Sequence, residues 1–272
     1  MDVDSERLIF AFGLTLLAGL ATGVGSGLAF FAKRTNTRIL SLALGFSAGV
    51  MIYVSLVEIF QKARESLVEP LGARGGHWAT VLAFFGGMAF IALIDKCVPS
   101  FENPHEIHKT EEMDNPALAA RFNRLYRMGI FTALAIAIHN FPEGLATFAA
   151  ALHDPHLGIA IAVAIAIHNI PEGVAVAIPI FYATGSRRKA FVYSFLSGLS
   201  EPLGAVVGYL LLSAFFNEIV FGVVFAGVAG IMVFISFDEL LPAAEEYGQH
   251  HLSVYGLILG MIVMALSLVM FS

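Results

Sequence analysis

The sequence predicts an all-α, polytopic membrane protein with eight transmembrane helices. Its 272 residues are 58% hydrophobic and only 13% charged, and their mean hydropathy is +0.80. A soluble domain carries about 25% charged residues. The apolar runs are also long enough for the roughly 20 helical residues that cross a bilayer. The eight runs are 8–32, 39–61, 78–98, 128–150, 157–181, 190–213, 218–237 and 254–271.

These runs leave no room for a separate soluble module, so residues 1–272 form a single transmembrane domain. The main interruption is 99–127, which mixes prolines, acids and bases and contains His105 and His108. We interpret it as a solvated cytoplasmic linker rather than a weak, mobile metal-collecting loop. The acidic N-terminus lacks the basic region of a signal peptide, so the first run is expected to remain as a span. A single cysteine, Cys97, excludes an intrachain disulfide and a thiolate-rich metal site.

Basic residues set the predicted orientation, because loops rich in Lys and Arg stay in the cytoplasm. If loops are assigned alternately to the two sides, eleven of the fifteen Lys and Arg residues fall on one side and four on the other. This asymmetry places both termini outside the cytoplasm. The formal net charge of −6 argues against nucleic acid as a partner.

A ten-residue motif, AIAIHN(F/I)PEG, occurs at 135–144 and again at 164–173. The copies place His139, Asn140 and Glu143 in the fourth run, and His168, Asn169 and Glu172 in the fifth. Carboxylates and imidazoles are costly inside apolar sequence and are rarely found there without a function. The short connection between these runs makes the two helices antiparallel, so the motifs can face each other at mid-bilayer. Inverted repeats with a site at the midplane are a recurring plan of secondary transporters.

The spacing within each copy suits a metal ion. His and Glu at i and i+4 share one helical face, and Pro142 and Pro171 each leave one backbone carbonyl without its helical donor. The glycine after each Glu allows another helix or an ion to approach. Glu201 adds a third carboxylate, in a span rich in Ser and Gly. Three Glu and two His suit divalent first-row metals; the alternatives are a hydrogen-bonded core and, for Glu201, helix packing.

Four further residues near the span ends are candidates for the ion pathway. Glu58 ends the second run on the external side, with Met51 two turns deeper on the same face. Asp238 and Glu239 end the seventh run on the internal side. The alternative is that these carboxylates are ordinary interfacial residues.

HNFPEG, HNIPEG and SGLSEP resemble the motifs of the ZIP metal transporters, and the similarity extends to ATGSRRKA and AGIMVFISFDELLP. Within that family the chain looks like the bacterial broad-specificity zinc uptake permeases. The resemblance implies eight helices around a binuclear metal centre, in the inner membrane, with extracytoplasmic termini. It implies one metal position formed by His139, Glu143, His168 and Glu172. The adjacent position would use Asn140, Asn169 and Glu201 and share Glu143 and Glu172. Some members have Gln-Asp in place of His168-Asn169, so the second position carries one negative charge fewer here.

The expected function is import of zinc, together with iron(II), manganese, cobalt and cadmium, into the cytoplasm. The alternatives are an efflux protein with the same site and an intramembrane metalloenzyme. In the paired motifs neither His is followed by Glu as in HExxH, and the order is His before Glu rather than Glu-x-x-His, so the motifs do not support an enzyme. The metal is therefore expected as cargo rather than as a resident cofactor, and the partners are divalent ions and the lipid bilayer. The sequence leaves monomer and homodimer as open alternatives.

Overall fold

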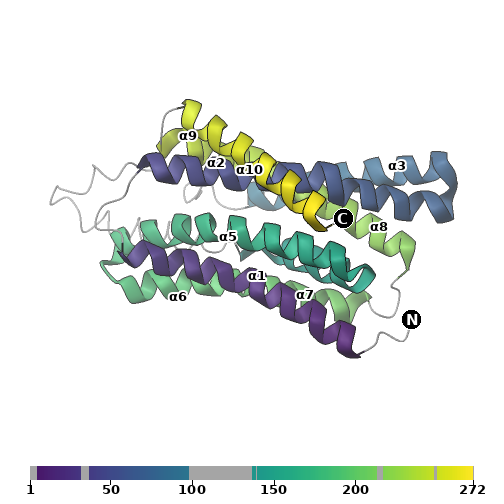
Figure 1. The fold of residues 1–272 in the computed structure, drawn as a ribbon, viewed down its shortest axis with the longest axis horizontal. Helices are drawn as coiled ribbons and strands as arrows, with labels where there is room; N and C mark the ends of the chain where they lie inside the picture. The colour runs from purple at the N-terminus through teal and green to yellow at the C-terminus, as the bar shows by residue number, and fades with distance from the viewer. Residues whose placement is uncertain are drawn as a thin grey trace.

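The computed structural model describes residues 5–31, 37–97, 137–138, 140–212, 217–247 and 250–271, and these form helices and short turns without a strand. Figure 1 shows the helices lying side by side in an elongated bundle, with both termini toward the same end. The all-α class predicted from composition is confirmed over these residues.

One group of helices carries both copies of the motif. It consists of α1 (Ser5–Phe31), a helix over 140–153, α5 (Pro155–Thr184), α6 (Arg187–Gly198) and α7 (Ser200–Leu212). The helix α1 packs along α5, α6 and α7. Asp154 caps α5, because its Oδ1 accepts from the backbone N–H of His156 at 2.9 Å, and Pro155 occupies the first helical turn. The chain therefore reverses within one residue between the two motif helices.

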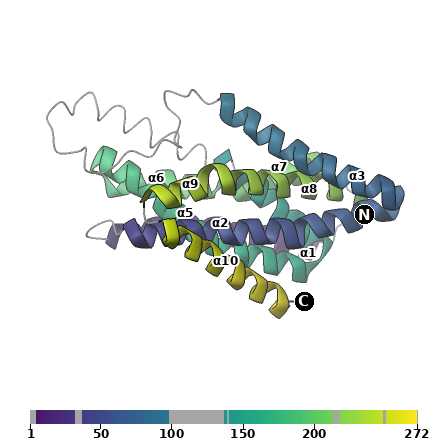
Figure 2. The same ribbon diagram turned by 90° about the horizontal axis from the view of Figure 1, so that it is seen from above.

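The second group forms the other part of the bundle. It contains α2 (Thr37–Tyr53), η1 (Val54–Ile59), α3 (Phe60–Cys97), α8 (Glu218–Ile235), η4 (Ser236–Leu240), α9 (Leu241–Tyr247) and α10 (His250–Phe271). Here α2 packs against α10 and α9, and α3 packs against α8. The helix α3 bends sharply at Gly72, whose φ of 70° and ψ of 164° lie outside the helical region. The chain doubles back at this bend, and Figure 2 shows the returning part of α3 running along α8.

The two groups meet where α5 lies against α2 and α10, and also in the main apolar core, where Ala146, Ala149 and Ala150 cluster with residues of α3 and α8. In Figure 1 the row with α2, α9 and α10 lies above the row with α1, α5, α6 and α7. The metal motifs thus belong to one group, while the predicted pathway residues Met51, Glu58 and Asp238 belong to the other.

Six helical stretches of the described chain are long and apolar enough to cross a membrane. One of them, 41–94, contains both the second and the third predicted spans, which the bend at Gly72 separates. The first part of the fourth predicted span, 128–136, and His139 lie outside the described residues. A multi-pass membrane protein is therefore confirmed, whereas the count of eight spans stays a prediction.

The helices continue past two of the predicted span ends. Glu58 lies in the π-helical turn η1 and Asp238 in η4, and helical structure extends beyond each of them. After Glu58 the helix extends to the bend at Gly72, and after Asp238 it extends to Tyr247. Hydropathy detects the membrane-embedded part of a helix, and these helices extend past it as charged segments.

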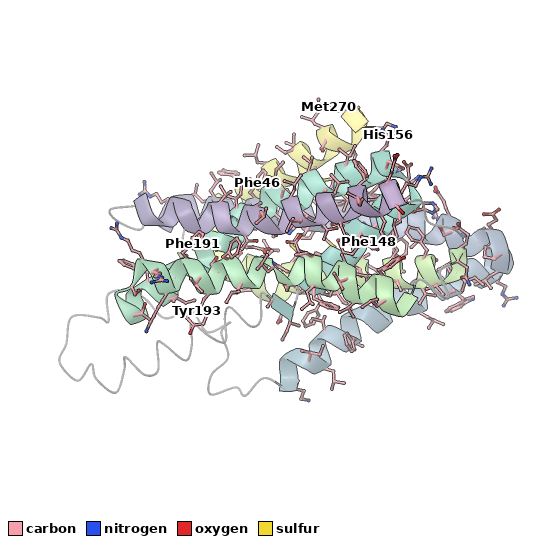
Figure 3. The ribbon with its side chains drawn as sticks, turned by 90° about the horizontal axis from the view of Figure 1, so that it is seen from below. Phe46, Phe148, His156, Phe191, Tyr193 and Met270 are labelled. Atoms are coloured by element: carbon pink, nitrogen blue, oxygen red, sulfur yellow. The ribbon has the colours of Figure 1, made fainter. Side chains whose placement is uncertain are left out.

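Side chains on the outside of the bundle are apolar, as expected for contact with lipid. Leu82 is 66% exposed and Met270 is 80% exposed. Figure 3 shows Met270 projecting from α10, whereas Phe148 lies between α1 and α7. Phe148 is 3% exposed and packs with Ala11 and Ala205.

Candidate metal centre

The second motif copy lies in the middle of α5, which continues without interruption through Pro171. His168, Asn169 and Glu172 are all fully buried. Nε2 of His168 lies 3.9 Å from Oε1 of Glu172. The i, i+4 spacing thus places this imidazole and this carboxylate on one face of the helix.

The first copy approaches the second from the neighbouring helix. Asn140 and Glu143 are fully buried, and Oε2 of Glu143 lies 3.3 Å from Nε2 of His168. The structure therefore brings the two motifs face to face. The remaining member of the first copy, His139, lies outside the described residues.

The third carboxylate joins the same cluster from α7. The amide nitrogen of Asn169 donates to Oε1 of the buried Glu201 and, at 2.9 Å, to the backbone carbonyl of Ala18 in α1. Because both amide hydrogens point at acceptors, Oδ1 of Asn169 is the atom left to face a cation.

Several oxygens of this cluster have no hydrogen-bond partner within the part of the chain that the structure describes. They are Oδ1 of Asn140, Oε1 of Glu143, Oδ1 of Asn169 and Oε2 of Glu201. Buried polar atoms are satisfied in roughly 90% of cases or more, because an unpaired one costs free energy. Four unpaired oxygen acceptors together are the ligand chemistry that a divalent cation would satisfy.

The described residues do not by themselves complete a ligand shell. Among them, no three His, Cys, Asp or Glu side chains stand in a metal-binding arrangement. His168 instead contacts the carboxylates of Glu143 and Glu172 directly. A cation between these groups would replace those contacts with metal–ligand bonds. The remaining predicted ligand, His139, lies outside the described residues.

Gly144 and Gly173 explain how the surrounding helices come so close. A Cβ on Gly144 would lie 2.0 Å from the backbone oxygen of Glu201, and one on Gly173 would lie 2.0 Å from that of Thr22. No side chain fits at either position. The glycine after each motif Glu thus brings α7 and α1 against the two motif helices.

Three polar groups at the centre were not predicted from the sequence. Ser47 of α2 donates to the backbone carbonyl of His168 at 3.2 Å, and the carbonyl of Ala18 holds Asn169. Thr147 is fully buried, and its hydroxyl has no partner among the described residues. Thr147 follows Glu143 by four residues, so its position on the motif face was visible in the sequence. Ser47 and Ala18 carry no such signal.

The predicted pathway residues differ in burial. Met51 is fully buried in the main apolar core, to which both groups of helices contribute, Glu58 is half-buried in η1, and Asp238 is exposed in η4. That Met51 and Glu58 share a face stays a prediction. The side chain of Glu239 lies outside the description.

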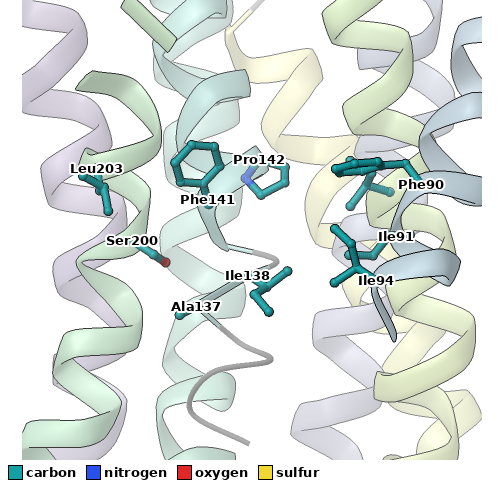
Figure 4. Close-up of a pocket in the computed structure, with 10 residues that line it drawn as sticks. Phe90, Ile91, Ile94, Ala137, Ile138, Phe141, Pro142, Ser200 and Leu203 are labelled. Atoms are coloured by element: carbon teal, nitrogen blue, oxygen red, sulfur yellow. The ribbon is translucent and has the colours of Figure 1, made fainter. Parts of the chain in front are cut away.

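A cavity of about 380 Å³ opens between the two groups beside the motif. Figure 4 shows Pro142 and Phe141 on one side of it and Phe90 of α3 on the other. Its lining is apolar except for Ser200, which precedes Glu201. Such a lining cannot replace the water shell of a divalent ion, so the cavity is not itself a cation site.

Comparison with known proteins decides the family. The model of the ZIP zinc transporter family matches residues 98–268, which include all three carboxylates of the centre. The chain belongs to the ZIP zinc transporter family. Members of this family are transporters, which excludes the metalloenzyme alternative.

Similar proteins cover the chain almost from end to end. A protein of Lysinibacillus sphaericus named zinc transporter ZupT is 65% identical over 97% of this chain and 98% of its own length. The zinc transporter ZupT of Nitratidesulfovibrio vulgaris is 64% identical over 99% of both chains. The protein of that name from Clostridium perfringens is 60% identical over 98% of both.

Proposed function

We propose that the protein imports zinc into the cytoplasm and also carries iron(II), manganese, cobalt and cadmium. Its ZIP family membership and its similarity to proteins named zinc transporters support zinc as cargo. Imidazole, carboxylate and amide ligands without a thiolate suit several divalent metals, which supports the broader range. Inward direction rests on the resemblance to uptake permeases.

The observation that carries the proposal is the set of buried oxygens at Asn140, Glu143, Asn169 and Glu201 that have no hydrogen-bond partner among the described residues. Four such acceptors in one place are suited to a positive charge. The cation neutralises Glu143, Glu172 and Glu201, which would otherwise bring three carboxylates together in an apolar surrounding.

In the proposed cycle the ion reaches the centre from the extracytoplasmic end, past Glu58 and Met51, and leaves toward Asp238 and Glu239. The distribution of basic residues supports this assignment of the two ends of the bundle, and with it both termini outside the cytoplasm. The two groups of helices supply different parts of this route, since the cation ligands and the pathway residues do not share a group.

The centre offers two unequal positions. His139, Glu143, His168 and Glu172 supply two imidazoles, which bind zinc well when neutral. The neighbouring position has Asn140, Asn169 and only one carboxylate of its own, Glu201. We therefore propose one tightly bound ion for each chain and a second that is bound weakly.

Uptake of radioactive zinc into right-side-out membrane vesicles tests the proposal. Vesicles with the protein should accumulate zinc, while vesicles with an equal amount of the Glu143→Ala variant should not. Accumulation in inside-out vesicles alone would establish efflux and overturn the import direction. No zinc movement in either orientation would overturn zinc as the cargo.

A further inference from the structure

The two groups of helices are joined at one end by the side chain of His153. This residue is the last of the helix 140–153, in the first group. Its ring stacks on Phe221 of α8, with centroids 4.5 Å apart and an angle of 14° between the planes. Its Nδ1 also lies 4.0 Å from Oε1 of Glu218, at the start of α8.

This contact is rigidly connected to the metal centre. His153 and Glu143 lie on one continuous helix, ten residues apart, which corresponds to about 15 Å along its axis. Asp154 then starts α5 within one residue. Any displacement of the motif helices relative to α8 must therefore break or slide the contact of His153.

The contact combines a buried apolar part with an exposed polar part, as a closure that can open would. Phe221 is buried, with 1% of its surface exposed, while the side chains of His153 and Glu218 are 35% and 44% exposed. The stacked rings form an apolar plug toward the interior, and the polar contact between His153 and Glu218 faces the outside. Stacking of one aromatic pair and one exposed polar contact are both weak interactions, so neither locks the helices.

We propose that His153, with Phe221 and Glu218, forms the outer gate of the metal pathway, closed in this structure. The gate must open for a cation to reach Glu143, because an ion from this end has to pass between the group that holds the ligands and the group that holds Met51 and Glu58. This inference rests on the proposed transport function.

Cross-linking tests the gate directly. His153→Cys with Glu218→Cys, on a Cys97→Ser background, is treated with a short bifunctional methanethiosulfonate, and zinc uptake is measured before and after. We expect uptake to fall at least tenfold on cross-linking and to return when a reductant cleaves the link. The matched control is Glu245→Cys with His250→Cys, two residues of the second group whose side chains lie 2.8 Å apart. Its cross-link should leave uptake unchanged.

Unchanged uptake with the first pair fully cross-linked would overturn the gate, and so would failure of that pair to link under conditions that link the control. The function and the gate can fail separately. If the Cys97→Ser parent does not take up zinc, the proposed function fails; if it does and only the linked pair behaves wrongly, the gate fails.

A second measurement does not require transport. Thr147→Cys, buried between the gate and the centre, is labelled with an impermeant thiol reagent from outside. Replacing His153 by Ala should increase its labelling rate several-fold. Replacing His156 by Ala, an exposed histidine of the same turn, should not. Equal rates in the two variants would refute a gate at His153.

Discussion

Gly144→Ala should disable the metal centre without changing any ligand. The added Cβ would lie 2.0 Å from the backbone oxygen of Glu201, whereas ordinary contacts begin at 3.4 Å. The helix 140–153 and α7 would have to separate by about 1.4 Å, the difference between these distances. Glu143 and Glu201 would move apart with their helices, and metal–ligand distances tolerate only about 0.2 Å.

A misplacement of about 1 Å costs on the order of 100-fold where function depends on positioned groups. We therefore expect the initial rate of zinc uptake in vesicles to fall by roughly 10- to 100-fold. Equilibrium binding of radioactive zinc to the purified variant should show a matching loss of the weaker ion, which depends on Glu201.

The control is Gly13→Ala, which adds the same methyl group to α1 where no described atom beyond the adjoining part of that helix lies within 4 Å. It should transport zinc at the parent rate. Insertion of a methyl into a packed interface costs about 1–3 kcal/mol, so both variants are compared by thermal unfolding and by amount in the membrane. A folded Gly144→Ala protein with near-normal uptake would refute the argument that this close approach builds the centre.

Three other results are expected. Either Glu143→Ala or Glu172→Ala should abolish zinc uptake at equal abundance in the membrane, and near-normal uptake by one of them would contradict a shared site. Excess manganese, iron(II), cobalt and cadmium should each reduce zinc uptake while Cu(I) should not, since the ligands lack a thiolate; failure of all four to compete would indicate a filter outside the centre. Glu201→Gln should retain one tight ion in equilibrium binding but lose the weak one, and loss of the tight ion would reverse the assignment of the two positions.

The loop 99–127 should modulate uptake rather than create it. Replacing His105 and His108 by Ala should change the apparent affinity or rate only modestly, because imidazoles scattered among prolines and acids hold an ion weakly. Both quantities are obtained from zinc uptake measured over a range of zinc concentrations without competing ions. Complete loss of uptake by a correctly inserted variant would show that the loop carries an essential site.

The sequence predicted the helical class and the meeting of the two motifs, because both follow from local rules. An i, i+4 pair has one face in any helix, and a one-residue turn makes neighbouring helices antiparallel. The contact between His168 and Glu143 follows from these two facts. The membership of Glu201 in the cluster followed from its being a carboxylate in an apolar span.

Other features could not be predicted because they arise from long-range packing. The carbonyl of Ala18 and the hydroxyl of Ser47 contribute through where α1 and α2 happen to lie, and nothing in their neighbouring residues marks them. The division into two helix groups is likewise a property of contacts between distant segments. The turns at Glu58 and Asp238 escaped because a hydropathy profile does not register the hydrogen-bond pattern of a helix.

The π-helical turn η1 sets the direction of Glu58 independently of the metal centre. A π turn holds one residue more than an α-helix of the same path. Deleting a single residue within Val54–Ile59 would restore the α-helix and keep the flanking helices in register, so that the direction of Glu58, which lies inside the turn, would change most. Every proposed ligand of the centre would stay the same. The direction of this carboxylate can therefore diverge between related transporters through one insertion or deletion.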